Sequence, residues 1–227
     1  CAICLDTLRK PTTLACGHRF CGSCVTSMRE RDIDEAQVCG QVPRLVDAMI
    51  GVVTTNEACY RALKSASQDL GQIASPDDCY LALRGLRTMA IRLERHGRSA
   101  LAVATWLQSR PEVERVMYPG LPSDPYHQRA KSYCTERGMG CMLMFTLKGG
   151  YDDAVAFING LKLASHLANV GDAKTLVIHP ASTTHQQLSE SEQQSAGVAP
   201  TMVRVSVGIE HIDDIVGDFE QALAGLQ

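Results

Sequence analysis

Seven residues near the N-terminus have the spacing of zinc ligands. They read C-x2-C, then C-x-H-x2-C-x2-C, then a single cysteine: Cys1, Cys4, Cys16, His18, Cys21, Cys24 and Cys39. Zinc prefers four sulfur or nitrogen donors in a tetrahedron, and short C-x2-C steps suit that geometry. Because a small zinc module is largely unfolded without its metal, this spacing strongly constrains how the N-terminal part can fold.

The N-terminal pattern resembles a RING finger. The resemblance rests on C-A-I-C at residues 1–4, C-G-H-R-F-C-G-S-C at residues 16–24, and Cys39. In that family the ligands bind in a cross-brace. By position, Cys1, Cys4, Cys21 and Cys24 form the first site, and Cys16, His18 and Cys39 form the second. A RING closes with C-P-x-C, whereas residues 39–42 read C-G-Q-V. Val42 therefore stands at the eighth ligand position and cannot bind a metal.

The three-ligand set leaves two interpretations open. Either water or a distant donor completes it, as in catalytic zinc sites, or it is a damaged structural site. RING modules recruit a ubiquitin-conjugating enzyme through apolar residues near the first and last ligand pairs. Ile3 matches the first contact, but Gly40 replaces the proline of the second. A degenerate RING-type ubiquitin ligase, or a zinc-dependent protein-binding module, is therefore the alternative function.

Composition excludes several functional classes. The chain has 45% hydrophobic and 21% charged residues, as in an ordinary globular protein. A net charge of -3 argues against nucleic-acid binding. No apolar run approaches the roughly 18 residues of a membrane span. Six of the ten cysteines lie beside a histidine in the zinc-like segment, which favours metal in a reducing, cytoplasmic compartment. Because the chain begins at Cys1 instead of Met, we expect it to be a fragment.

The remaining residues show helix and strand patterns in mixed order. A Val-rich run at residues 45–57 predicts a buried strand. Ser75 and Pro76 then open a predicted long helix that bends near Gly97 and ends before Pro111. Further predicted strands are 114–118, 141–147, 164–170, 176–179 and 202–208, with helices at 152–161 and from residue 212. This order implies an α/β or α+β sheet with helices on one side.

Four motifs occur along this segment: S-P-D-D-C-Y-L-A-L-R-G-L-R-T at 75–88, Y-P-G-L at 118–121, H-P-A-S-T-T-H at 179–185 and V-R-V-S-V-G-I-E at 203–210. Together they closely resemble the C-terminal part of the Cys/Met-metabolism, pyridoxal-phosphate (PLP)-dependent trans-sulfuration enzymes. The first motif is most similar to cystathionine β-lyase. L-A-N-V-G-D-A-K at 167–174 is more similar to O-acetylhomoserine sulfhydrylase. The resemblance implies the C-terminal domain of a fold-type I PLP enzyme, with a mixed sheet covered by helices, in a homo-oligomer.

The resemblance also implies site residues. Arg204 matches the family arginine that binds the α-carboxylate of the amino-acid substrate, and Asn169 aligns beside it. A guanidinium suits this role because it binds a carboxylate through two parallel hydrogen bonds. The alternative for Arg204 is an ordinary surface arginine on a strand. The family motif from His179 to His185, which includes Ser182 and Thr183, lies near the cofactor.

The cofactor lysine is missing from its expected place. In this family PLP forms a Schiff base with a lysine in the motif S-x-T-K-Y-x-x-G-H-x-D and acts as an electron sink. Asp47 matches the last residue of that motif, which places the lysine at Gly40. We expect the upstream cofactor-binding domain to be absent as well. We therefore expect two parts, a RING-like zinc module at 1–44 and the trans-sulfuration segment at 45–227.

From these parts we expect an inactive member of a family of C–S lyases and transferases that act on cystathionine- or O-acetylhomoserine-like substrates. Two alternatives stay open for the missing lysine. Either a partner chain supplies it together with the cofactor groups, or the chain is a mis-spliced or mispredicted gene product.

Overall fold

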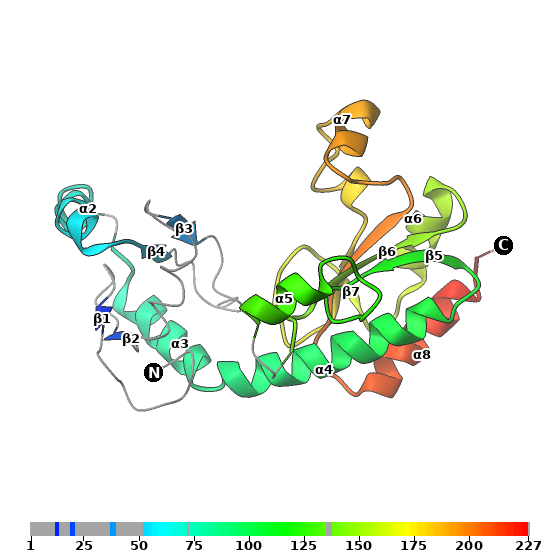
Figure 1. Ribbon diagram of the computed structural model, residues 1–227, viewed down its shortest axis with the longest axis horizontal. Helices are drawn as coiled ribbons and strands as arrows, with labels where there is room; N and C mark the ends of the chain where they lie inside the picture. The colour runs from blue at the N-terminus through cyan, green and yellow to red at the C-terminus, as the bar shows by residue number, and fades with distance from the viewer. Residues whose placement is uncertain are drawn as a thin grey trace. The chain divides into compact units, whose positions relative to one another are not determined.

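The computed structural model describes residues 52–71, 73–134 and 138–226, and before them only three short strands (Figure 1). These strands are β1 (Thr12–Thr13), β2 (Arg19–Phe20) and β3 (Gln37–Cys39). The chain divides into two compact units, Cys1–Ile91 and Arg92–Gln227. Within the described residues, no helix is long and apolar enough to cross a membrane.

The first unit contains two antiparallel strand pairs. β1 pairs with β2, and β3 pairs with β4 (Val52–Thr54), so that Cys39 lies opposite Val52. The predicted strand at 45–57 is too long at its C-terminal end. β4 ends at Thr54 because Asn56 caps the next helix, α2 (Glu57–Asp69), by accepting a hydrogen bond from the backbone N–H of Cys59. Residues 45–51 lie outside the described part.

The predicted single long helix is two helices. Ser75 does cap the first of them, α3 (Pro76–Arg87), with its Oγ 3.0 Å from the backbone nitrogen of Asp78. At Thr88 the backbone leaves helical geometry, with φ -107° and ψ 4°, and α4 (Met89–Gln108) begins at the next residue. The break therefore falls at a β-branched residue, whereas Gly97, where we expected a bend, lies inside α4.

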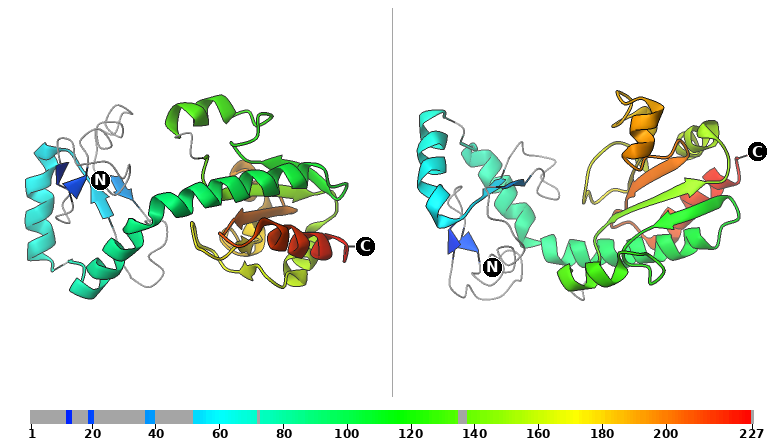
Figure 2. Two further views of the ribbon diagram at one scale, coloured as in Figure 1. Left: turned by 90° about the horizontal axis from the view of Figure 1, so that it is seen from below. Right: turned by 45° about the horizontal axis from the view of Figure 1, so that its top comes forward.

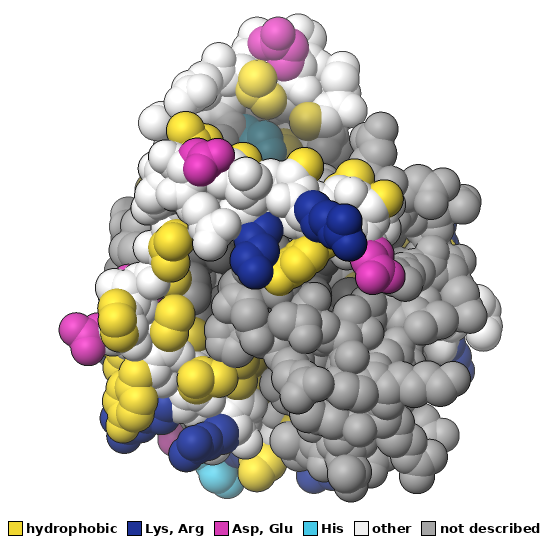
Figure 3. Space-filling model, turned by 90° about the vertical axis from the view of Figure 1, so that its left-hand side faces the viewer, with side chains coloured by type: hydrophobic (Ala, Val, Ile, Leu, Met, Phe, Trp, Pro, Cys, Tyr) yellow, Lys and Arg dark blue, Asp and Glu magenta, His cyan; other side chains and the backbone are white. Residues whose placement is uncertain are grey.

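Large hydrophobic side chains are exposed in the first unit. Tyr80 and Leu83, three residues apart on α3, and Ile91, at the start of α4, are 64%, 45% and 69% exposed, and the exposed Leu70 and Ile73 precede them in the chain. Figure 3 views this side of the chain and shows hydrophobic side chains gathered in a column, with basic side chains at its lower end.

The second unit is built on a five-stranded mixed sheet with the strand order β5-β6-β9-β8-β7. The strands are β5 (Val113–Met117), β6 (Met142–Leu147), β7 (Ser165–His166), β8 (Leu176–Ile178) and β9 (Met202–Ser206). Every pair is antiparallel except β7 with β8. The mixed sheet confirms the expected fold class, although the strand predicted at 164–170 contains only residues 165 and 166.

The core lies on one face of this sheet. Alternate residues of β6 and β9 point into it, including Leu143, Phe145 and Val205, each at most 1% exposed. Helices α4, α6 (Tyr151–Gly160) and α8 (Ile212–Leu223) supply the other side of the core, and α4 and α8 run alongside the sheet in Figure 2. Two edge-to-face aromatic contacts, Phe145 with Phe157 and Phe157 with Phe219, join the sheet to two helices at 5.5 Å.

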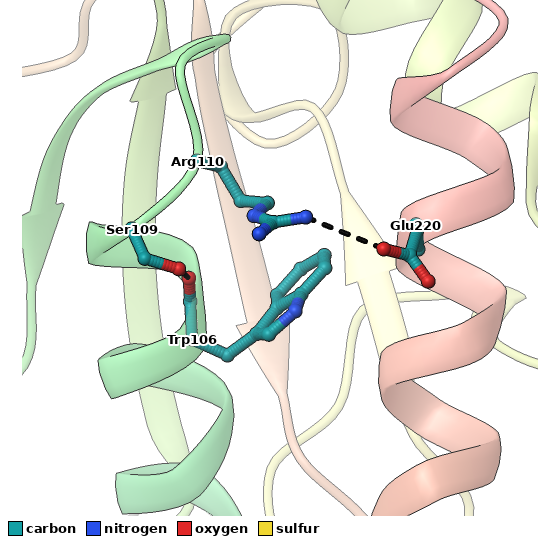
Figure 4. A network of polar contacts seen from close by, with 4 residues as sticks. All are labelled: Trp106, Ser109, Arg110 and Glu220. Carbon is teal, nitrogen blue, oxygen red and sulfur yellow. Dashed lines mark hydrogen bonds and ion pairs between the residues drawn. The ribbon is translucent and has the colours of Figure 1, made fainter.

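A surface contact joins the end of α4 to α8 (Figure 4). The guanidinium of Arg110 lies 4.9 Å from the ring centre of Trp106 and 3.3 Å from a carboxylate oxygen of Glu220. The cation–π contact holds the arginine over the indole while its tip reaches the acid. Because Glu220 is exposed, the ion pair itself adds little stability.

In the described part of the second unit, three short elements were not predicted: α5 (His127–Tyr133), the 3-10 turn η1 (Pro180–Ser182) and α7 (Glu190–Ser195). For α7 the sequence does contain a signal, because Ser189 and Glu192 form a reciprocal capping box. The η1 turn and α7 belong to a long segment between β8 and β9, with α7 standing away from the sheet in Figure 1.

Candidate carboxylate-binding site

Arg204 lies on the face of the sheet opposite the helical core. Its neighbours Val203 and Val205 are fully buried in the core, so strand alternation directs Arg204 to the other side. On that face it stands directly opposite Met144 of β6 and Ile178 of β8. Its half-buried environment suits an arginine that binds a ligand from one side of a sheet.

The guanidinium of Arg204 pairs with no other residue in the described part of the protein. No hydrogen bond or ion pair joins its guanidinium to another residue described by the structure. Arg110 and Arg98, by contrast, each contact a glutamate. A half-buried guanidinium without a protein partner has donors available for a carboxylate, which it binds best in the bidentate mode.

A turn that carries Asn169 is tied to the same face. Gly171 adopts the left-handed region, with φ 72°, and donates its backbone N–H to the Oγ of Ser206 at 3.1 Å. Ser206 is two residues beyond Arg204, so both side chains point to the same face of β9. The structure therefore brings the turn with Asn169 and the strand with Arg204 together. The Oδ1 of Asn169 accepts the backbone N–H of Val170, which orients its amide locally.

Besides the bond from Gly171 to Ser206, a clamp made by Glu210 holds the other end of this turn. The carboxylate of Glu210 accepts hydrogen bonds from the backbone nitrogen of Thr175 at 2.6 Å and from its Oγ1 at 2.9 Å. Gly208 packs against the Glu210 carboxylate and the backbone of Ala173 and Thr175. A Cβ at this position would clash with the carboxylate and lie 2.5 Å from the carbonyl oxygen of Ala173. Glycine is therefore needed at this crossing. The clamp fixes the approach of the turn to the end of β9.

The motif around His179 is occupied by its own contacts. His179 is 1% exposed, and its Nδ1 and Nε2 lie 2.9 Å from Ser182 Oγ and 2.7 Å from the Pro200 carbonyl oxygen. Thr183 Oγ1 donates to the carbonyl of His179. These residues lock the η1 turn and do not present free groups. His185 is half-buried and contacts Thr184 Oγ1.

Tyr118 is unsuited to acid–base chemistry. It is 1% exposed, and its hydroxyl donates to the carbonyl of Gly140 at 3.0 Å. Burial raises the pKa of Tyr118 to about 12, and the nearby thiols of Cys141 and Cys134 add to the shift. The phenol therefore stays neutral at physiological pH and acts as a core residue.

The described residues do not fit a covalently held PLP. A Schiff base needs a lysine that is held against the cofactor in the substrate site. All lysines within the described part are exposed: Lys64, Lys131, Lys148, Lys162 and Lys174. The side chains of the seven predicted zinc ligands lie outside the described residues. Elsewhere in the described part, no group of three or more His, Cys, Asp or Glu residues could hold a metal.

Comparison with known proteins decides the family. The family model for the Cys/Met metabolism PLP-dependent enzyme matches residues 45–224. The chain belongs to this family. A model for the C3HC4-type, RING, zinc finger matches residues 1–41. Both resemblances inferred from the sequence are supported, the first over most of the chain.

Several members of this PLP family are similar to this chain in sequence. O-acetyl-L-homoserine sulfhydrylase 1 of Thermus thermophilus is 52% identical over 157 residues, which are 69% of this chain and 37% of the relative. Homocysteine synthase of Schizosaccharomyces pombe is 54% identical, covering 69% of the chain and 36% of the relative. Cystathionine gamma-lyase of Dictyostelium discoideum is 39% identical, covering 78% and 46%. The chain thus spans less than half the length of these relatives.

A crystal structure supports the fold. A putative O-acetylhomoserine (thiol)-lyase from Campylobacter jejuni, with pyridoxyl-lysine phosphate, matches with a TM-score of 0.69 and 40% identity. The match covers 73% of this chain and 39% of that one. The fold of the matched residues therefore corresponds to part of a fold-type I PLP enzyme.

Proposed function

We propose that this chain carries the part of a trans-sulfuration enzyme that recognises the α-carboxylate of a sulfur amino-acid substrate. Arg204 is the anchor, and Asn169 orients the bound group from the adjoining turn. The main support is the half-buried Arg204 guanidinium, which has no partner among the described residues and lies beside a turn held by Ser206. Homology to O-acetylhomoserine sulfhydrylases makes O-acetyl-L-homoserine the first substrate to test.

The proposed role does not include chemistry at the substrate side chain. In this family PLP supplies the electron sink for that chemistry when it is bound. In this chain the expected lysine position is Gly40, and the described lysines are all exposed. We propose that the chain binds the amino acid without turning it over unless another polypeptide supplies the lysine and the cofactor groups. Its own residues then only position the carboxylate.

The N-terminal segment adds a second proposed property. The match of residues 1–41 to a C3HC4-type zinc finger supports zinc binding by the four-cysteine set: Cys1, Cys4, Cys21 and Cys24. The second set, Cys16, His18 and Cys39, has one ligand fewer. Recruitment of a ubiquitin-conjugating enzyme and location in the cytoplasm stay predictions from the sequence.

Arg204 variants test the carboxylate site. We would titrate the full chain with O-acetyl-L-homoserine and follow the side-chain Nε–H signals of arginine by NMR. Arg204→Lys keeps the positive charge but loses the two parallel N–H donors of the guanidinium. Affinity should therefore fall at least about tenfold, as expected for a lost charge-assisted hydrogen bond. Arg115→Lys is the matched control, because Arg115 is an exposed arginine on the same sheet face. Equal losses in both variants, or no loss in Arg204→Lys, would reject specific binding of the carboxylate by Arg204.

A further inference from the structure

Met144 stands directly beside the proposed anchor. On β6 it is the cross-strand partner of Arg204 on one side and of Met117 on the other. Directly opposed residues on neighbouring antiparallel strands have Cβ atoms about 4.5–5.5 Å apart and side chains on the same face. The flexible thioether of Met144 is therefore within reach of the Arg204 guanidinium.

Met144 is also the accessible methionine of this face. It is 37% exposed, whereas Met202, on the same face one strand away, is 4% exposed. Met117 and Met142 are half-buried. A thioether that solvent reaches is open to peroxides, and oxidation converts a flexible apolar side chain into a polar one. Among these four residues, accessibility ranks Met144 first.

We propose that Met144 is a site of reversible oxidation to methionine sulfoxide, and that the sulfoxide oxygen binds Arg204. The oxidant is hydrogen peroxide or an alkyl hydroperoxide. Its O–O bond breaks, one oxygen forms a bond to sulfur, and the other leaves as water or an alcohol. The sulfur loses two electrons and the peroxide gains them. A sulfoxide reductase restores the thioether: two thiols supply two electrons and two protons and become a disulfide, and the sulfoxide oxygen leaves as water.

The consequence follows from the chemistry of the two neighbours. A thioether is only a weak acceptor and competes poorly for a guanidinium. A sulfoxide oxygen is a strong, partially negative acceptor, and Arg204 has no other partner among the described residues. The oxidised side chain therefore occupies donors that a carboxylate would use. This last step rests on the proposed function, whereas the contact between the sulfoxide and Arg204 does not.

Another arginine competes for the same oxygen. Arg115 lies opposite Thr146, two residues from Met144 on the same face, and is exposed. Because it is exposed to water, its guanidinium gains less from a new acceptor than the half-buried Arg204 does. The proposal therefore requires Arg204, and not Arg115, to respond to oxidation.

The first test is the site of oxidation. The full chain is treated with hydrogen peroxide, and the gain of one oxygen, about 16 Da, is followed for each methionine by peptide mass mapping. Met144 should react at least about fivefold faster than Met202. Equal rates at the two positions would overturn the proposal.

The second test is the response of the arginine. The Nε–H NMR signal of Arg204, assigned with Arg204→Lys, should shift on peroxide treatment of the native chain. It should stay in place in treated Met144→Leu, which keeps the size and polarity of the unoxidised side chain, and shift as usual in treated Met142→Leu, the matched control. A shift at Arg115 alone, or a full shift in treated Met144→Leu, would refute the contact.

Affinity for O-acetyl-L-homoserine then separates the two proposals. Oxidation should weaken binding to the native chain about tenfold and leave Met144→Leu unchanged. If the untreated chain does not bind the amino acid, the proposed function fails, and the Arg204 signal still decides the sulfoxide contact. If binding is present and is equal before and after oxidation at Met144, the competition is refuted while the proposed function stands.

Discussion

Ser206 accepts a hydrogen bond from the backbone N–H of Gly171 at 3.1 Å, and it does so in the interior, where Ser206 is 2% exposed. This bond ties the turn that carries Asn169 to the strand that carries Arg204, while the clamp of Glu210 on Thr175 holds the other end of the turn. The two partners, Gly171 and Ser206, are 35 residues apart in the chain, so the bond joins distant segments at the proposed site.

Ser206→Ala should separate the turn from the strand. The change leaves the Gly171 N–H without its acceptor, so we expect a loss of about 1–3 kcal/mol in the free energy of unfolding, measured by urea denaturation. Amide hydrogen exchange at Gly171 should accelerate, and affinity for O-acetyl-L-homoserine should fall. Ser132→Ala, in an exposed position of α5, should change none of these. Unchanged exchange at Gly171 in Ser206→Ala would show that the turn is held by other contacts.

Asp218 should be a large contributor to stability. Its carboxylate is 6% exposed and accepts the backbone N–H groups of Lys162 and Ala164 at 2.7 and 2.9 Å. Asp218→Ala leaves both donors unpaired and should cost about 3–5 kcal/mol, a large part of a domain's total stability. Asp218→Asn keeps one acceptor oxygen and should cost less. Asp214→Ala, exposed on the same helix, is the control, and an equal effect from it would contradict the proposed role of Asp218.

The chain should hold one zinc ion tightly. The first predicted set has four ligands and the second has three, so dialysed protein should contain about one zinc per chain by elemental analysis. Cys39→Ser, which affects only the second set, should leave that zinc in place, whereas Cys4→Ser should remove it. Two tightly held ions, or none, would count against the four-plus-three assignment.

PLP should form no covalent bond with this chain at a single defined lysine. Gly40 occupies the expected position, and the described lysines are exposed. After incubation with PLP and reduction with borohydride, mass spectrometry should show at most scattered, substoichiometric labelling. Stoichiometric labelling of one lysine would restore the hypothesis of an intact enzyme.

The first unit should promote self-association. Tyr80 and Leu83 of α3 and Ile91 at the start of α4 are large exposed hydrophobic side chains, and exposed apolar surface favours association. Replacing all three by serine should lower the apparent molar mass in concentrated solution and reduce binding of a hydrophobic dye. Lys64→Ser, exposed on α2, is the control. Light scattering that shows a monomer for the native chain would contradict the prediction.

Much of the second unit could be predicted from the sequence. The strands near Val113, Met142 and Met202 and the last helix from Ile212 follow clear hydrophobic patterns, and the structure has them within one or two residues. These elements pack on one hydrophobic core, so their apolar residues recur in the sequence at helix or strand spacing. The sheet order could not be predicted in this way, because pairing depends on contacts between distant segments.

The errors have local causes. The break at Thr88 interrupts a pattern that stays amphipathic on both sides, so periodicity alone joins α3 to α4. For the site, resemblance suggested Arg204 and Asn169, and their role stays a prediction. The bond from Gly171 to Ser206 and the position of Met144 were missed. The glycine in L-A-N-V-G-D hinted at a left-handed turn, but only strand register reveals which residue stands opposite Arg204.

The border between the two family matches falls inside a hairpin-like pair. Residues 1–41 match one family and residues 45–224 the other, yet β3 from the first pairs with β4 from the second, with Cys39 opposite Val52. Each side contributes one strand to a shared ladder, so exchanging either segment for another module would require a replacement strand of the same register.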